Sequence, residues 1–204
     1  MRVGPSSPVI ALSMNSIRHF LTPANAITSA GLAAGFLALL AIVDAQIWRA
    51  TIWVIVAAVL DSLDGAVARR GSGDHAFGTN LDSLADMVSF GVVPAIALHL
   101  GPLHALPILG LGASLVFLLG AGWRLARFPI VKRCHWFLGM PMPVAGVLLM
   151  VFLLWRPAPE LALIITGAIS ALLVSTLPFP TLQTIYRATS NTHRDHPRGR
   201  PPRR

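Results

Sequence analysis

Four long runs of the 204-residue sequence contain no Asp, Glu, Lys or Arg, and this pattern limits the chain to a membrane fold. The runs extend over residues 27–43, 87–123, 134–155 and 161–186. A helix needs about 20 residues to cross a bilayer, so with their flanking residues these runs can supply several spans. Only 12% of all residues are charged, about half of what is usual in a soluble domain. The sequence therefore predicts an integral membrane protein.

Glycine and proline divide the longest run. Residues 87–123 suffice for two helices if the first begins before the run, and Gly101-Pro102 together with Pro107 supplies the break. Ahead of the first span, a helical spacing of apolar residues suits a short interfacial helix, with Ile10, Met14, Ile17 and Leu21 on one face. The predicted fold class is all-α, a polytopic membrane protein with this short N-terminal helix and six transmembrane helices at approximately residues 23–43, 47–69, 77–99, 104–127, 139–156 and 160–180.

The basic residues gather on one side of this topology. With a cytoplasmic N-terminus, fourteen of the sixteen Lys and Arg residues face the cytoplasm and only Arg49 and Arg156 lie opposite, as the positive-inside rule requires. We expect a cytoplasmic N-terminal segment at 1–22, the helical domain at 23–180 and a disordered basic cytoplasmic tail at 181–204. The expected location is the plasma (inner) membrane, with both termini and the active site on the cytoplasmic side. The cations follow loops and tail, so a net charge of +8 does not predict nucleic-acid binding.

Four aspartates lie within this apolar sequence, where a carboxylate is costly and needs a functional reason. Asp61 and Asp64 come near the end of the second predicted span, and Asp82 and Asp86 near the start of the third. Residues three or four apart share a helix face, and a short loop makes the two helices antiparallel, so the four carboxyl groups can converge. Crowded carboxylates repel one another unless cations compensate them. Oxygen ligands without Cys or His favour magnesium, manganese or calcium, and four acids suit two ions that clamp phosphoryl groups.

Small residues accompany these acids. Gly65, Ala68 and Gly78 each lie one helical turn from an aspartate, which favours a slot shaped for a substrate. The alternative is that they only allow close helix packing. Two other interpretations of the acids are a structural salt-bridge cluster with nearby arginines and a membrane cation carrier. Carboxylates at the cytoplasmic end, rather than at mid-membrane between broken helices, favour an enzyme over a carrier.

The motif D-x2-D-G-x2-A-R-x8-G-x3-D-x3-D occupies residues 61–86, and by it the chain resembles the CDP-alcohol phosphatidyltransferase family. Residues 81–94, 124–128 and 139–143 are similar to the phosphatidylserine synthase branch, although Pro129 stands where that branch usually has Asn. The resemblance implies a phospholipid-biosynthesis enzyme that transfers a phosphatidyl group from CDP-diacylglycerol to L-serine and releases CMP. Glycerol 3-phosphate, an inositol phosphate or another alcohol is the alternative acceptor. A homodimer is implied by the family alone.

The resemblance also implies roles for particular residues. The metal ligands, for two Mg²⁺ or Mn²⁺ ions, would be Asp61, Asp64 and Asp82 with Asp86 beside them. Asp86 would also be the catalytic base that takes the acceptor's proton. The nucleotide and CDP-lipid would be bound by Asn25, Gly65, Ala68, Arg69 and Gly78. The acceptor or a phosphate would be held by Ser89, Arg124 and Arg127. Alternatively, the last two are positive-inside anchors, and Asn25 and Ser89 are cap or packing residues.

Overall fold

The computed structural model describes residues 22–68, 75–131 and 140–175, and every element in these ranges is a helix. In chain order the elements are α2 (Pro23–Val43), α3 (Ile47–Ala68), α4 (His75–Asp86), the π-helix η2 (Met87–Val92), α5 (Val93–Leu100), the 3-10 helix η3 (Pro102–Ala105), α6 (Pro107–Val131), α7 (Met142–Leu154) and α8 (Pro159–Val174). The all-α prediction is therefore confirmed for the described residues. The predicted interfacial helix, the predicted basic tail and Arg69 lie outside these ranges.

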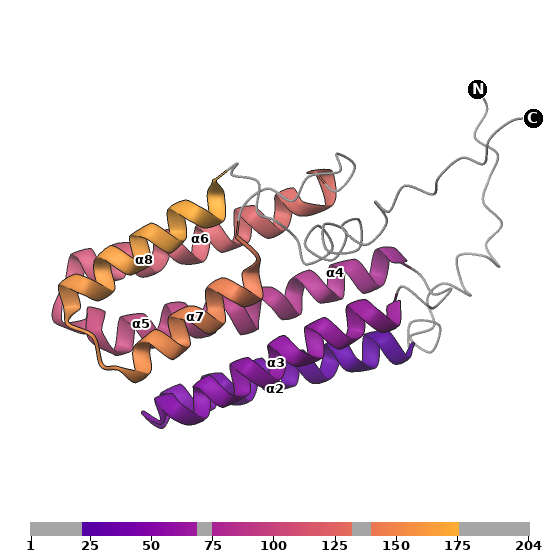
Figure 1. Cartoon of the computed structure of the whole chain (residues 1–204), viewed down its shortest axis with the longest axis horizontal. Helices are drawn as coiled ribbons and strands as arrows, with labels where there is room; N and C mark the ends of the chain where they lie inside the picture. The colour runs from indigo at the N-terminus through magenta and orange to yellow at the C-terminus, as the bar shows by residue number, and fades with distance from the viewer. Residues whose placement is uncertain (1–21, 69–74, 132–139, 176–204) are drawn as a thin grey trace, which may run out of the picture.

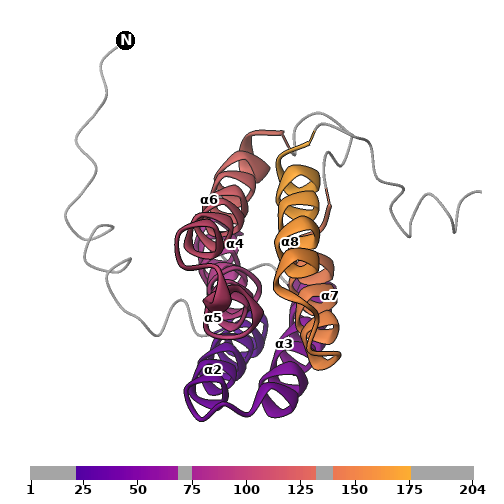
Figure 2. The same ribbon diagram turned by 90° about the vertical axis from the view of Figure 1, so that its left-hand side faces the viewer.

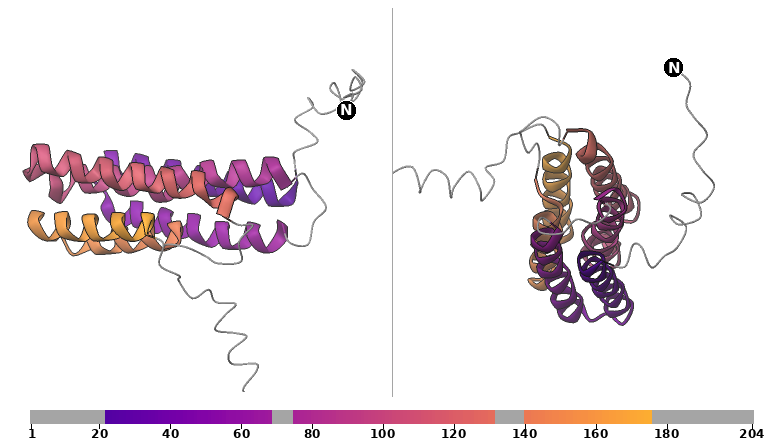
Figure 3. Two further views of the ribbon diagram at one scale, coloured as in Figure 1. Left: turned by 90° about the horizontal axis from the view of Figure 1, so that it is seen from above. Right: turned by 90° about the vertical axis from the view of Figure 1, so that its right-hand side faces the viewer.

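The helices pack side by side in an elongated bundle of two layers (Figures 1, 2 and 3). One layer contains α2, the continuous rod of α4, η2 and α5, and α6; the other contains α3, α7 and α8. Across the layers α2 packs mainly on α3, and α6 on α8. In this arrangement α4 packs mainly on α2 and makes a smaller contact with α3.

Four helical segments are long and apolar enough to cross a membrane, namely Pro23–Val43, Ile47–Val67, Phe77–Leu100 and Pro107–Arg127. They correspond to the first four predicted spans, and the chain breaks at Gly101 and Pro107 as expected. The last two predicted spans correspond to apolar helices of only 13 and 16 residues, α7 and α8, which are shorter than the roughly 20 residues of a full span. The structure thus supports a membrane protein with four helices of spanning length in the described part of the chain.

The π-helix η2 joins α4 to α5 just before a proline. Pro94 has no N–H, and in a regular α-helix its ring would clash with the carbonyl of residue 90. The turn ahead of it is widened, because the N–H of Val93 donates to the carbonyl of Val88, five residues earlier. A wide turn of this kind changes the angular register between α4 and α5, and such turns are frequent at functional sites.

Glycines allow η2 to fit between α2 and α7. A Cβ atom on Gly35 of α2 would collide with the Oγ of Ser89. A Cβ atom on Gly146 of α7 would lie 2.8 Å from the Cβ and 2.9 Å from the Cα of Phe90. The segment that directly follows Asp86 is therefore held from both sides by close backbone contact.

Candidate metal centre and active site

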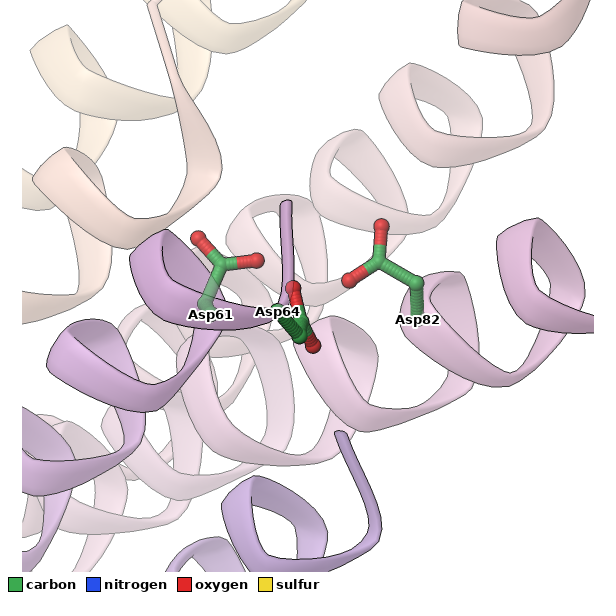
Figure 4. A group of neighbouring side chains, drawn as sticks. All are labelled: Asp61, Asp64 and Asp82. Atoms are coloured by element: carbon green, nitrogen blue, oxygen red, sulfur yellow. The ribbon is translucent and has the colours of Figure 1, made fainter. Parts of the chain in front are cut away.

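The end of α3 and the beginning of the rod that starts with α4 bring three aspartates together (Figure 4). One carboxylate oxygen from each of Asp61, Asp64 and Asp82 lies within 4.8 Å of the other two. Divalent cations bind oxygen at about 2.0–2.6 Å, so two ligands of one ion lie at most about 4–5 Å apart. The three carboxylates are thus close enough to share a cation.

Asp86 flanks this group, at the junction of α4 and η2. Its carboxylate lies within electrostatic range of the three clustered aspartates and of the Arg124 guanidinium on α6. Both Asp86 and Arg124 are half-buried. The structure therefore gathers all four predicted aspartates, three at mutual ligand distance and the fourth within electrostatic range of these three and of the Arg124 guanidinium.

A small pocket with a free volume of about 10 Å³ lies among these side chains. That volume corresponds to about one water-sized sphere, so the pocket admits an ion but not a nucleotide or a lipid. It is lined by Thr28, Gly31, Ala57, Asp61, Asp64, Asp82, Ala85, Asp86, Ser89 and Phe90. A larger substrate would have to lie outside this pocket, with only its charged centre against the carboxylates.

The donor set fits a hard divalent cation. Four carboxylates at one end of an apolar bundle repel one another strongly unless positive charge compensates them. Three of them offer oxygen atoms at ligand distance, and oxygen is the donor that magnesium, manganese and calcium prefer. A divalent cation is therefore the compensation that the geometry of this cluster favours.

Two of the predicted nucleotide-binding residues face each other next to the cluster. Asn25 is buried in the first turn of α2, where its N–H donates to the Oγ1 of the capping residue Thr22 at 3.2 Å. A Cβ atom on Gly78 of α4 would lie 3.1 Å from the Asn25 Oδ1, so a glycine here lets the α4 backbone approach Asn25. Gly65 is half-buried one turn after Asp61, and Ala68 is the last residue of α3.

The three residues predicted to hold the acceptor or a phosphate lie in different environments. Ser89 is buried in η2, three residues after Asp86, and its hydroxyl donates to the carbonyl of Gly31 at 3.4 Å. Arg124 is half-buried and interacts electrostatically with Asp86, whereas Arg127 is exposed near the end of α6. The hydrogen bond of Ser89 joins two helices and is typical of helix packing. Of the two arginines, only Arg124 interacts with the acidic cluster in the described part of the chain.

The sequence interpretation missed Thr28, which contacts a predicted metal ligand directly. Its Oγ1 donates to the Oδ2 of Asp64 at 2.6 Å. Thr28 comes three residues after Asn25, so it shares a helix face with a residue that was singled out. Its partner is 36 residues away along the chain, and only the packing of α2 on α3 brings the two together.

Comparison with known proteins identifies the class to which this fold and site belong. The chain is a member of the CDP-alcohol phosphatidyltransferase family, whose model matches residues 21–179. This family of enzymes depends on divalent metal, in agreement with the acidic cluster. The family resemblance predicted from the motif is thereby confirmed, and the cation-carrier alternative is set aside.

Curated relatives extend this result. The chain is 35% identical over 178 residues to the archaetidylserine synthase of Methanothermobacter thermautotrophicus, covering 85% of this chain and 76% of that protein. It is 34% identical over 155 residues to the CDP-diacylglycerol–serine O-phosphatidyltransferase of Bacillus subtilis, covering 76% and 87%. An enzyme of the same name from Methanocaldococcus jannaschii is 32% identical over 167 residues, covering 82% and 78%.

Proposed function

We propose that this protein transfers the phosphatidyl group of CDP-diacylglycerol to L-serine, forming phosphatidylserine and CMP. The observation that carries the proposal is the convergence of Asp61, Asp64 and Asp82 within a complete family motif. One of the three relatives is named for a different lipid, but all three names include serine, which supports serine over glycerol 3-phosphate or an inositol phosphate.

In this proposal Asp61, Asp64 and Asp82 hold the divalent metal, with Asp86 beside them. The metal is Mg²⁺ or Mn²⁺, and the four negative charges suffice for two ions. A bound divalent metal supplies charge neutralisation to the diphosphate of the CDP-lipid. The pocket among the carboxylates is ion-sized, which is consistent with the diphosphate lying at its mouth.

Asp86 is the proposed general base. It accepts the proton of the serine hydroxyl as a new oxygen–phosphorus bond forms, and CMP leaves with the electron pair of the broken phosphorus–oxygen bond. Arg124 holds the serine carboxylate through charge-assisted hydrogen bonds, and its electrostatic interaction with Asp86 supports an anchor close to the base. Arg127 would hold a lipid phosphate nearer the surface. For Ser89, the hydrogen bond to Gly31 favours a packing role over acceptor binding.

The nucleotide is proposed to bind where α2, α3 and α4 meet. The residues for this role are Asn25, Gly65, Ala68, Arg69 and Gly78. The close approach of Asn25 and Gly78 supports a shared surface formed by α2 and α4. A nucleotide is too large for the ion-sized pocket, so we expect it to lie outside that pocket, toward the end of α3 and the beginning of α4.

We further propose that residues 23–180 form a six-span domain in the plasma membrane, between a cytoplasmic segment at 1–22 and a basic tail at 181–204. The distribution of Lys and Arg supports a cytoplasmic active site and cytoplasmic termini. The acyl chains of the substrate would then stay in the bilayer while its head group reaches the aspartates. The proposed assembly is a homodimer.

The experiment that tests this function measures CMP release from CDP-diacylglycerol by the purified protein in detergent. Serine, glycerol 3-phosphate and inositol phosphate are compared as acceptors, with and without a chelator. We expect CMP with serine, loss of CMP when the metal is chelated, and recovery with Mg²⁺ or Mn²⁺. Absence of CMP with every acceptor would contradict the enzyme, whereas CMP with glycerol 3-phosphate but not serine would contradict only the acceptor.

A further inference from the structure

Thr28 connects the first spanning helix to the acidic cluster. Its hydroxyl lies 2.6 Å from the Oδ2 of Asp64 and 3.1 Å from the carbonyl of Ala24 in its own helix. A hydroxyl has one hydrogen to donate. The hydrogen bond to a carboxylate is charge-assisted and here also the shorter, so the proton of Thr28 is directed to Asp64.

Both partners of this hydrogen bond are nearly closed to bulk water. Thr28 and Asp64 are 5% and 6% exposed, and both line the pocket among the aspartates. Gly31, one turn further along α2, packs against α3, where an added Cβ atom would touch the Cβ of Leu60 at 3.7 Å. The α2 backbone is therefore held close to α3 at the level of Asp64, with the Thr28 hydroxyl in a defined position.

We propose that Thr28 is a positioning residue for the metal ligand Asp64. The inference rests on the proposed metal site and adds a residue of α2 to it. By accepting a hydrogen bond on Oδ2, the Asp64 carboxylate is fixed in rotation, so that it stays turned toward the space it shares with Asp61 and Asp82 (Figure 4). Outer partners that orient metal ligands in this way typically contribute about 10–100-fold to metal affinity.

The chain offers a matched control in Thr51. This threonine is also buried, and its hydroxyl lies 2.9 Å from the carbonyl of Ile47 and 3.3 Å from that of Met150 on a neighbouring helix. It belongs to α3, as Asp64 does, but lies more than two turns before the acids. Thr51→Val therefore removes a comparable buried hydroxyl without touching a carboxylate.

The test measures Mn²⁺ binding to the detergent-purified protein without lipid substrate, by electron paramagnetic resonance of the free ion. We expect Thr28→Val to raise the Kd for Mn²⁺ by about 10–100-fold. Thr28→Ser should stay within about 3-fold of the unsubstituted protein because it keeps the hydroxyl, and Thr51→Val should leave the Kd unchanged. In turnover assays, Thr28→Val should raise the metal concentration needed for half-maximal rate more than it lowers kcat at saturating metal.

Three outcomes would overturn the inference. If Thr28→Val binds Mn²⁺ as the unsubstituted protein does, the role of Thr28 is wrong and the proposed function stands. If Thr51→Val weakens binding equally, the effect is one of general stability. If the unsubstituted protein binds no Mn²⁺, the metal site itself fails. Should Thr28→Val not fold, Thr28→Ala and Thr28→Ser are compared instead, and equal Mn²⁺ affinity in those two contradicts the role.

Discussion

Replacing Gly146 by alanine tests whether η2 is held as tightly as the structure indicates. The new Cβ atom would lie 2.9 Å from the Cα of Phe90, while ordinary contact begins at 3.4 Å. The two backbones would therefore have to separate by about 0.5 Å, the difference between these two distances. Because the obstructing atoms include backbone, rotation of the Phe90 side chain cannot relieve the clash.

The expected magnitude follows from two opposing contributions to the free energy of unfolding. Alanine is favoured over glycine inside a helix by about 0.8–1 kcal/mol. Overpacking a tight contact costs about 1–3 kcal/mol. Gly167 of α8 is the matched control, because a Cβ atom there meets nothing within 4 Å and only the first contribution applies. Gly146→Ala should consequently be less stable than Gly167→Ala by about 1–3 kcal/mol.

Thermal unfolding in detergent, followed by tryptophan fluorescence, measures this difference. At roughly 2–4 °C per kcal/mol, the midpoint of Gly146→Ala should lie several degrees below that of Gly167→Ala. CMP release should fall as well, by about 10-fold, because a 1 Å misplacement near reacting groups can lower a rate by about 100-fold and Phe90 is one turn from Asp86. A Gly146→Ala protein as stable as Gly167→Ala would refute the close packing of η2 against α7.

Three substitutions test the proposed roles of site residues. Asp86→Asn should lower kcat by about 10²–10⁴-fold while sparing the affinity for CDP-diacylglycerol; equal losses in a binding assay and in turnover would show that Asp86 is chiefly a ligand. Gly65→Leu should raise the KM for CDP-diacylglycerol by filling the space beside Asp61, and an unchanged KM would remove Gly65 from the nucleotide pocket. Arg124→Lys loses a charge-assisted hydrogen bond of about 1.5 kcal/mol, so the KM for serine should rise about 10-fold with the KM for the CDP-lipid unchanged. If neither KM changes, Arg124 is only a positive-inside anchor.

The sequence predicted the part of the site that depends on local geometry. Asp61 with Asp64, and Asp82 with Asp86, are spaced by one helical turn, so their shared faces follow from helix periodicity alone. Their meeting across the α3–α4 connection follows from its shortness, and the structure places Asp61, Asp64 and Asp82 within 4.8 Å of one another. The break at Gly101 was predictable for a similar reason, because glycine and proline interrupt helices wherever they occur together.

The remaining features depend on how distant helices pack, which spacing does not encode. Thr28 and Asp64 are 36 residues apart, and Arg124 reaches Asp86 from a separate helix. The π-turn of η2 has no periodic signal of its own. The fifth predicted span, 139–156, extends beyond both ends of α7, and the sixth, 160–180, continues past Val174, where α8 ends. A charge-free run shows where a helix can lie but not where its hydrogen bonding stops; Ser175, for example, has extended backbone.

The arrangement of the first helix explains how the distance between the ligand-bearing helices is set. α2 carries none of the four aspartates, yet it forms hydrogen bonds with both segments that flank the acidic cluster, α3 and η2. Thr28 donates to Asp64 on α3, and the Gly31 carbonyl accepts from Ser89, which follows Asp86 by three residues. Thr28 and Gly31 lie on adjacent turns of α2, and α2 packs closely on both α3 and η2. A shift of α2 would therefore move the aspartates of α3 relative to those of α4. Substitutions on this face of α2 should therefore weaken metal binding without removing any ligand, whereas Gly167→Ala, on the exposed face of α8, should leave it unchanged.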